Sequence, residues 1–270
     1  MTPPPTVAPD AGQAPENEDA KGGGALAQPD DSMSGDYAAK TFYRGDVARH
    51  YDQVRQKTRS GARKWRREEE ALRRVLRRLP AHSTILDSPC GTGRFAQVFG
   101  DVGLRSVGLD ISSDMLAMHR RAAPEEPDRI RLLQADLERL PLGDSSVDYV
   151  VAMRFFNLVP LGVAQRVLRE FSRVARSGVI TEIRLAGEKP WDGARRRLRR
   201  MAAAARRWAH RGGVNPGSPP GPGPLRIHRA GEFRDAARSA GLRVESLTEV
   251  LPSTLHQPDA LHLVVLGRDH

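Results

Sequence analysis

The stretch ILDSPCGTGRFAQVF, residues 85–99, contains the local signals of a strand, a loop and a helix in succession. It begins with apolar and β-branched residues up to Asp87, a composition typical of a buried strand. Gly91 and Gly93 then allow a tight turn and a close approach of the backbone to a ligand. A helix that opens near Arg94 leaves its first amide groups without partners, and such amides readily bind ligands. The stretch therefore predicts a strand–loop–helix unit built around a ligand.

The same alternation of strand and helix patterns continues along the chain. Short β-branched runs are separated by helical stretches such as SDMLAMHRRA and LGVAQRVLREFSRVAR. The runs are RSVGLD (105–110), RIRLLQAD (129–136), VDYVVAMRF (147–155) and SGVITEIRL (177–185). This alternation predicts βαβ units, a mostly parallel sheet and a doubly wound α/β fold. The two closing runs, 242–250 and 260–267, are joined by a connection too short for a crossover helix, so we expect an antiparallel hairpin there.

Composition divides the chain into a tail and one domain. Residues 1–36 are rich in Pro, Gly, Ala and acidic residues and have almost no large apolar side chains, so we expect them to be disordered. Residues 37–270 are expected to form a single domain. Within it, helical apolar spacing predicts an N-terminal helical cap at 37–80. Residues 187–226 are expected to form an insertion made of a basic helix and a Pro/Gly-rich loop.

The charge and cysteine content restrict the partners and the compartment. The net charge is +10 with a sequence pI near 10.5, and the arginine excess favours anionic partners. Cys90 is the single cysteine, which excludes an intramolecular disulfide and a multi-cysteine metal site, and we predict no metal. The N-terminus lacks a signal-peptide pattern, and no apolar run approaches the roughly 18 residues of a membrane span. We therefore expect a cytoplasmic protein.

Three aspartates follow successive predicted strands. Asp110 ends the second strand about twenty residues beyond the glycines, where a carboxylate accepts hydrogen bonds from ribose hydroxyls. Asp87 directly precedes the loop, where it would repel the pyrophosphate of a dinucleotide but would tolerate a ligand with an amino group and no phosphate. Asp136 could accept a hydrogen bond from an adenine amino group. S-adenosylmethionine, which carries an ammonium, a sulfonium, a ribose and an adenine, fits this pattern better than NAD does.

The segments ILDSPCGTGRFA, VGLDISSDMLAMHRR and LQADLERLPLGDSSVDYVVAMRFFNLVP resemble the successive motifs of class I S-adenosylmethionine-dependent methyltransferases, particularly the methyltransferase-domain type 11 group. The resemblance covers about residue 46 to the C-terminus. It implies a Rossmann-like, mostly parallel seven-stranded sheet with one reversed strand, and S-adenosylmethionine as the cofactor. The residues that it places at the cofactor are Asp87, Cys90, Gly91 and Gly93 at the methionine end, Asp110 and Ile111 at the ribose, Met115, Asp136 and Leu137 at the adenine, and Arg154 beside the reacting methyl.

One position departs from the commonest pattern of that family. Pro89 stands where the first glycine of the loop is usually found, and it has no amide N–H to offer a ligand. The sequence Pro-Cys-Gly-Thr-Gly is similar to a variant of the family loop, so we interpret it as the mark of a subgroup. Cys90 is interpreted as a small buried loop residue rather than a nucleophile.

Three further residues are candidates for a catalytic role. His228 precedes a predicted helix and could act as a general base, because an imidazole titrates near neutrality. The alternative, a histidine that only begins the helix, is favoured. Tyr51 lies in the N-terminal segment that closes over the cofactor in similar enzymes, and its alternative is simple helix packing. Arg154 is the third candidate, from its expected place beside the methyl.

The segment 191–211 is a cationic amphipathic helix by its pattern. Apolar residues recur at spacings of three and four, and arginines surround the apolar stripe. One interpretation is a helix whose stripe packs on the domain while its arginines are solvated. The others are a lid over an apolar or anionic substrate and a helix in contact with a membrane surface. Nucleic-acid binding is not favoured, because few aromatic residues accompany the arginines.

The function predicted from these patterns is a methyltransferase that acts on a small-molecule or lipid-like acceptor. The alternatives are an RNA methyltransferase, for which the net charge is the reason, and a non-catalytic S-adenosylmethionine-binding module. An NAD-dependent dehydrogenase is disfavoured by Asp87 and by the closing hairpin. Acceptor pockets are built from variable segments, so the pattern leaves open the acceptor atom, the general base and the oligomeric state.

Overall fold

The computed structural model describes residues 39–122, 131–186, 225–252 and 259–268. The expected tail at 1–36 and the expected amphipathic helix at 191–211 lie outside these ranges, as does most of the expected insertion at 187–226. All the described residues belong to one compact unit, 31–270.

The described chain forms a doubly wound α/β sheet, which confirms the predicted fold class. The strands are β1 (Thr84–Asp87), β2 (Arg105–Asp110), β3 (Arg131–Gln134), β4 (Val147–Ala152), β5 (Ala175–Ala186), β6 (His228–Arg229), β7 (Leu242–Leu251) and β8 (Asp259–Arg268). Their order across the sheet is β3-β2-β1-β4-β5-β8-β7. The pairs from β3 to β5 are parallel, whereas β8 is antiparallel to both β5 and β7, as expected for the closing hairpin.

The sheet has one more strand than the seven that the resemblance implies. The short strand β6 pairs in parallel with the end of β5, through Leu185↔His228 and Ala186↔Arg229. β5 has room for it because the last pair between β4 and β5 is Ala152↔Thr181. Beyond that pair the backbone groups of β5 are available to a new neighbour, because β4 has already ended.

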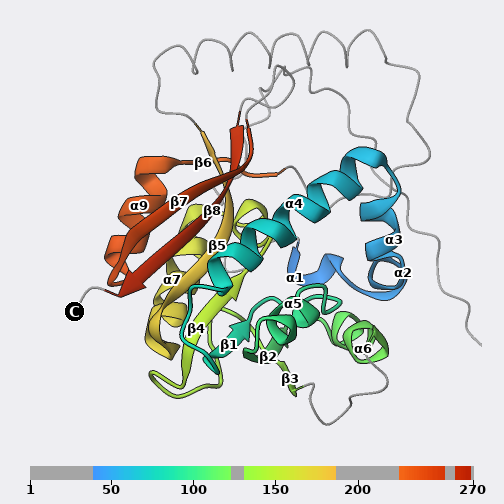
Figure 1. The fold of residues 1–270 in the computed structure, drawn as a ribbon, viewed down its shortest axis with the longest axis horizontal. Helices are drawn as coiled ribbons and strands as arrows, with labels where there is room; N and C mark the ends of the chain where they lie inside the picture. Colours follow the sequence, from blue (N-terminus) through green and yellow to red (C-terminus); the bar gives the residue numbers. More distant parts are fainter. Residues whose placement is uncertain (1–38, 123–130, 187–224, 253–258, 269–270) are drawn as a thin grey trace, which may run out of the picture. The chain divides into compact units, whose positions relative to one another are not determined.

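Helices cover both faces of the sheet (Figure 1). They are α1 (Ala39–Phe42), α2 (Gly45–Arg49), α3 (Tyr51–Gln56), α4 (Arg59–Leu76), α5 (Ala96–Asp101), α6 (Ser113–Ala122), the 3-10 helix η1 (Phe156–Leu158), α7 (Leu161–Val174) and α9 (Ala230–Ser239). Helices α7 and α9 pack on one face, around Phe156, Phe171 and Phe233, and α4 and α5 pack on the other, around Leu72 and Phe99. Helices α1 to α4 lie within the segment expected to form the cap at 37–80, with non-helical residues between them, and helix α5 begins at Ala96 rather than near Arg94.

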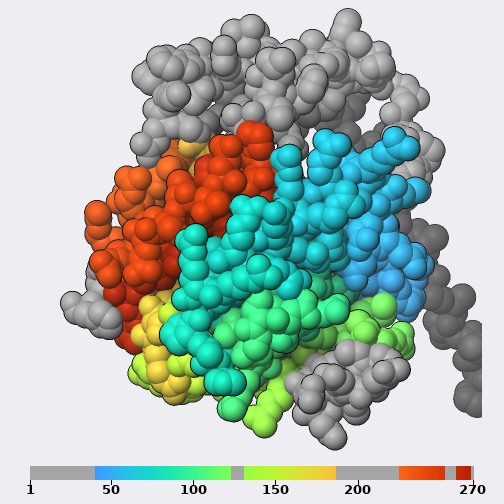
Figure 2. Space-filling view, viewed as in Figure 1, coloured from blue at the N-terminus to red at the C-terminus, as the bar shows by residue number. Residues whose placement is uncertain are grey.

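The long helix α4 owes its limits and its inward face to local sequence. Thr58 precedes it, and its side-chain oxygen accepts a hydrogen bond of 3.0 Å from the amide of Gly61, which caps the helix N-terminus. Leu72 and Leu76 are fully buried one turn apart, as the helical spacing predicts. In Figure 2 the cyan surface of this helix lies against the red atoms of the closing strands, in agreement with the contacts between α4 and β7.

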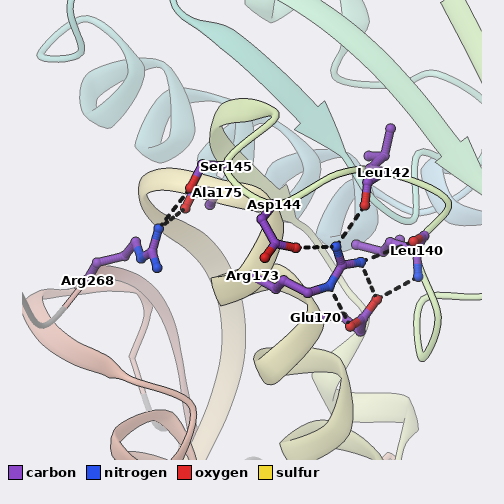
Figure 3. A network of polar contacts seen from close by, with 8 residues as sticks. All are labelled: Leu140, Leu142, Asp144, Ser145, Glu170, Arg173, Ala175 and Arg268. Carbon is purple, nitrogen blue, oxygen red and sulfur yellow. Dashed lines mark hydrogen bonds and ion pairs between the residues drawn. The ribbon is translucent and has the colours of Figure 1, made fainter.

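A polar network fastens the loop that precedes β4 (Figure 3). The guanidinium of Arg173, on α7, donates hydrogen bonds to the carbonyls of Leu140 and Leu142 and to the carboxylates of Asp144 and Glu170, at 2.7–3.1 Å. The Arg173 side chain is partly exposed. Its hydrogen bonds to four acceptors hold a loop that has no helix or strand of its own. The network lies where β4 and β5 begin, so it supports the sheet from the edge opposite to the carboxyl ends of these strands.

Candidate functional site

A pocket opens at the carboxyl ends of β1, β2 and β4. The chain order reverses there, because β1 is flanked by β2 on one side and by β4 on the other, and such switch points bind ligands in open α/β sheets. The pocket is lined by Tyr43, Tyr51, Pro89, Cys90, Gly91, Thr92, Arg94, Phe95, Asp110, Ile111, Met115, Leu137, Met153, Arg154, Phe155 and Leu158. Seven of the ten residues predicted at the cofactor line it; Asp87, Gly93 and Asp136 do not.

The glycine loop forms the floor of the pocket. Gly91 and Gly93 both have positive φ, +55° and +83°, which explains why the loop uses glycine at these two positions. The peptide bond between Ser88 and Pro89 is cis. The amide of Cys90 donates to the carbonyl of Leu109 at 2.9 Å, so the loop is fastened to the end of β2.

A side chain at Gly93 would overlap the imidazole ring of His119, on α6. His119 is buried and its two ring nitrogens have no hydrogen-bond partner among the described residues. Burial lowers the pKa of His119 to about 4, with a smaller contribution from the charge of Arg120. The neutral ring therefore acts as a packing surface under the loop.

We expect Gly93→Ala to destabilise the protein by about 2 kcal/mol or more, because it combines an unfavourable positive φ with overlap in a packed site. Chemical denaturation measures the loss. The matched control is Gly91→Ala, which has a similar φ but no atom of the described chain within 4 Å of the new Cβ, so its loss should be smaller. Equal losses would contradict this account. Adding His119→Ala to Gly93→Ala should restore part of the stability.

Asp110 fastens the loop and also faces the pocket. Its Oδ2 accepts a hydrogen bond of 2.9 Å from the amide of Gly91, and its Oδ1 accepts one of 2.9 Å from the amide of Ser112. Burial raises the pKa of Asp110, and these amides act in the opposite direction. Each carboxylate oxygen can accept a second hydrogen bond, so the side chain retains the capacity to bind a ribose.

Asp87 lies below the loop as a buried and unsatisfied carboxyl group. Neither of its oxygens has a hydrogen-bond partner within the described chain. Burial, and after it the nearby charge of Asp110, raise the pKa of Asp87 well above its ordinary value. A buried acceptor of this kind is costly unless a donor reaches it, and the ammonium group of a bound amino acid is such a donor.

Asp136 lies outside the pocket. Lys40, on α1, forms ion pairs with Asp136 at 2.8 Å and with Glu138 at 3.0 Å, and the Asp136 side chain is 34% exposed. Leu137, its neighbour, does line the pocket. A role of Asp136 at an adenine edge therefore stays a prediction, and it would require Asp136 to serve Lys40 and the ligand together.

Polar contacts attach the first part of the N-terminal cap, residues 43–52, to the pocket. The hydroxyl of Ser112 donates to the carbonyl of Tyr43, and the carboxylate of Asp114 accepts from the amide of Gly45 at 2.7 Å. Thr92, in the glycine loop, donates to Asp52 at 3.1 Å. Tyr43 and Tyr51, which line the pocket, meet edge to face with ring centroids 5.6 Å apart. The cap thus contributes aromatic walls to the site.

A buried ion cluster lies beside the pocket, and sequence analysis missed most of it. Glu68, on α4, is fully buried; it pairs with Arg154 at 2.5 Å, with Arg94 at 2.6 Å and with Lys64 at 3.2 Å. Burial alone would raise the pKa of Glu68, but the charges of these three cations outweigh it and lower the pKa. Trp65 stacks against the guanidinium of Arg94, 3.7 Å from its ring centroid. Glu68 stands in a charged run, so the sequence gives no local signal that it is buried. The position of Arg94 directly after the glycine loop could have indicated that Arg94 lies near the pocket.

Glu182, on β5, faces the same cluster. Both of its carboxylate oxygens are buried and lack a hydrogen-bond partner in the part of the chain that the structure describes. Burial, followed by the charge of Glu68, raises the pKa of Glu182 to about 7. It is therefore only partly ionised near neutral pH.

Of the catalytic candidates, Tyr51 and Arg154 line the pocket and His228 does not. The Nε2 of His228 donates to the carbonyl of Phe156 at 2.8 Å, so this ring joins β6 to η1. Its pKa is lowered, chiefly by burial. Burial and the charges of Asp87 and Asp110 raise the pKa of the Cys90 thiol well above its ordinary value, which suits the structural role interpreted from sequence.

The residues present fit S-adenosylmethionine. Among the lining residues, Asp110 has acceptor capacity for a ribose, and Met115 and Leu137 offer apolar surface for an adenine, whereas Asp87 is buried and does not line the pocket. Within the described ranges, three or more His, Cys, Asp or Glu side chains are nowhere grouped so as to hold a metal ion. None of the described helices has the length and apolar character needed to cross a membrane.

Comparison with known proteins agrees with this geometry. Residues 86–181 match a family described as "Methyltransferase domain". The malonyl-[acyl-carrier protein] O-methyltransferase of Pectobacterium atrosepticum is 37% identical over 110 residues, which are 39% of this chain and 40% of that protein. The demethylmenaquinone methyltransferase of Beutenbergia cavernae is 32% identical over 147 residues, which are 54% of this chain and 57% of that protein. The matches thus span about half the length of these curated relatives.

A solved structure shows the same fold. The magnesium protoporphyrin IX methyltransferase of Synechocystis PCC 6803, with bound S-adenosylhomocysteine, covers 85% of this chain and 98% of its own with a TM-score of 0.62. Its sequence identity is only 13%, so the likeness is one of fold. Residues 86–181 thus match a methyltransferase domain, and the described chain has the fold of class I S-adenosylmethionine-dependent methyltransferases.

Proposed function

We propose that this protein transfers the methyl group of S-adenosylmethionine to a small-molecule or lipid-like acceptor. The observation that carries the proposal is the pocket at the switch point, where the glycine loop and Asp110 meet above the unsatisfied Asp87. When bound, the cofactor supplies a methyl group made electrophilic by its sulfonium. The protein's part is to orient the reactants and exclude water, and the aromatic walls from the N-terminal cap serve the second purpose.

The side of the pocket next to β4 suits an apolar acceptor. Its walls include Phe95, Met153, Phe155 and Leu158, and Phe155 and Met153 are buried. The names of the relatives state action on malonyl-[acyl-carrier protein], on demethylmenaquinone and on magnesium protoporphyrin IX. These names support a small-molecule or lipid-like acceptor and leave its identity to experiment.

The alternative of an RNA methyltransferase rests on the net charge of +10. The arginine cluster at 195–200, which would carry that role, lies outside the described residues. It predicts RNA binding that weakens with salt and is lost when those arginines are neutralised. A protein that binds the cofactor product tightly yet methylates no class of acceptor would instead favour the non-catalytic module.

The first test is calorimetric titration of the purified protein with S-adenosylhomocysteine, with NAD as the control ligand. We expect binding of S-adenosylhomocysteine alone. Asp110→Asn should raise its dissociation constant about tenfold or more, because the variant loses a charged acceptor for the ribose hydroxyls and must still serve two backbone amides.

The matched control for this variant is Asp148→Asn. Like Asp110, Asp148 accepts a backbone hydrogen bond, of 2.8 Å from the amide of Thr84 at the start of β1, but it lies away from the pocket. The affinity of the Asp148→Asn variant for S-adenosylhomocysteine should stay at the wild-type value. Wild-type protein that fails to bind S-adenosylhomocysteine would refute the proposed function.

A further inference from the structure

The outward face of α4 carries a row of arginines. The exposed residues of the segment 59–78 are one serine, one glutamate and seven arginines, and these seven form what we call the arginine stripe: Arg59, Arg63, Arg66, Arg67, Arg74, Arg77 and Arg78. Their positions follow the three- and four-residue spacing of a helix, with Glu70 on the turn between Arg66 and Arg74. The stripe therefore lies on one face and extends over about 27 Å, the length of α4 up to its C-cap. Figure 2 shows the cyan surface of this helix in view.

Acidic side chains do not balance the stripe. Within the described chain, Arg74 is its one member that pairs with an acid, Glu70, at 2.6 Å. Like charges four residues apart on a helix repel one another, as Arg59 and Arg63 do here, so the stripe by itself disfavours the helix. The buried face of α4, with Leu72 and Leu76, holds the helix in place. An anionic partner would remove the repulsion among the arginines.

The surface around the stripe favours phosphates over a protein as that partner. Among the described residues, the exposed large apolar side chains are Val54, Leu225, Ile227, Val244 and Leu247, and none of them belongs to α4. Protein interfaces usually have an apolar or aromatic core, which α4 does not offer. The guanidinium group matches the geometry of phosphate oxygens, and both lipid headgroups and nucleic acids present phosphates.

Two features favour a lipid surface over a nucleic acid. Single strands are bound by stacking on exposed aromatic side chains, whereas Trp65, the aromatic residue of α4, stacks against Arg94 with 3.7 Å to its ring centroid. A helix that reads a duplex enters a groove, whereas α4 packs against α5 and β7 and presents one face only. An anionic bilayer requires no more than a group of cations at its surface.

Helix α4 also connects the stripe with the pocket. Glu68, on its inner face, pairs with Arg94 and Arg154, and both of these arginines line the pocket. A helix with its side chains is about 10–12 Å across, so the stripe lies about that distance from the ion cluster. A bilayer bound to the stripe would therefore lie near the site of methyl transfer.

We propose that the arginine stripe of α4 binds the surface of an anionic lipid bilayer and so concentrates the protein where a lipid-like acceptor resides. The choice of a bilayer rests in part on the proposed function. The binding itself requires neither cofactor nor acceptor, because it joins exposed guanidinium groups to lipid phosphates.

The test is sedimentation of the full-length protein with vesicles. We expect wild type to sediment with vesicles of phosphatidylcholine that contain about 30% phosphatidylglycerol, and not with vesicles of phosphatidylcholine alone. High salt should release the protein, because it screens exposed charges. The stripe variant combines Arg59→Gln, Arg63→Gln, Arg66→Gln and Arg67→Gln. Its partition coefficient on the anionic vesicles should fall about tenfold or more, since each cation near the surface contributes to binding.

The matched control removes the same number of charges from the other side of the sheet. It combines Arg169→Gln, Arg229→Gln, Arg234→Gln and Arg238→Gln, which are exposed positions on α7, β6 and α9. Both variants have the same net charge and an unchanged segment 191–211. The control should bind the anionic vesicles as wild type does. Equal losses in the two variants, or no loss in the stripe variant, would overturn the assignment to α4.

A competition decides between lipid and nucleic acid. Wild type is mixed with anionic vesicles and with a duplex of about 30 base pairs at equal phosphate concentration, and it should sediment with the vesicles. Protein that stays with the duplex, or that binds neither, overturns the proposal. Calorimetry with S-adenosylhomocysteine tests the methyltransferase function separately. Protein that binds vesicles but not S-adenosylhomocysteine would thus refute that function alone, and the reverse result would refute the docking surface alone.

Discussion

Glu68→Gln is expected to lower the free energy of unfolding by about 3–5 kcal/mol, the range observed when one partner of a buried ion pair is removed. Glutamine keeps the shape of the side chain, so the loss reports charge. Glu68 is fully buried and is the firmly ionised partner of Lys64, Arg94 and Arg154. Without its charge, the counter-charges near these cations are the partly ionised Glu182 and the partly exposed Glu69, 3.9 Å from Arg94. Denaturation by urea at neutral pH measures the change.

The matched control is Glu69→Gln, one residue further along the same helix. The side chain of Glu69 is 30% exposed, and its distance to Nε of Arg94 is 3.9 Å. Because this distance is long and Glu69 is partly open to solvent, we expect the pair to contribute about 1 kcal/mol or less. Similar losses in both variants would show that the cluster does not stabilise the fold in the way that its geometry indicates. Weaker binding of S-adenosylhomocysteine by Glu68→Gln would further show that the ion cluster, by holding α4 against the pocket, contributes to ligand affinity.

Glu182→Gln is expected to stabilise the protein at alkaline pH. The pKa of Glu182 is about 7 in the folded protein, above the ordinary value of 4.5. Between these values the folded state binds a proton that the unfolded state has released, so the stability contributed by the protonated group is lost as pH rises towards and through 7. By pH 8 that loss is on the order of 3 kcal/mol. Glutamine does not titrate, so the variant should lack this decline.

The measurement is urea denaturation of wild type and variant across pH 4.5 to 8. The difference between them should be small at the acid end and should grow through neutrality in favour of the variant. Glu70→Gln is the control, because Glu70 is exposed and forms a surface ion pair with Arg74. Its pH dependence should follow that of wild type. Parallel curves for Glu182→Gln and wild type would mean that Glu182 is ionised in the folded protein throughout.

Much of the fold and part of the site could be predicted from the sequence. The loop glycines were identified from their spacing, and their positive φ values explain the requirement for glycine. Asp110 was singled out from its distance along the chain, and it does meet the loop, since the carboxyl ends of adjacent parallel strands lie side by side. The closing hairpin followed from the shortness of its connection. Each of these inferences depends on residues that are close in sequence or on a general rule of sheet topology.

The ion cluster depended on the tertiary structure. Glu68 and Arg154 are 86 residues apart, and in the sequence each stands among other charged or apolar residues with nothing to mark it as buried. The same holds for His228, whose place in the short strand β6 is set by how far β5 extends beyond β4. Helix and strand patterns are readable because they repeat over a few residues. Burial and charge pairing arise only when distant segments exclude water together, so the packed fold alone decides which charges meet and which pKa values shift.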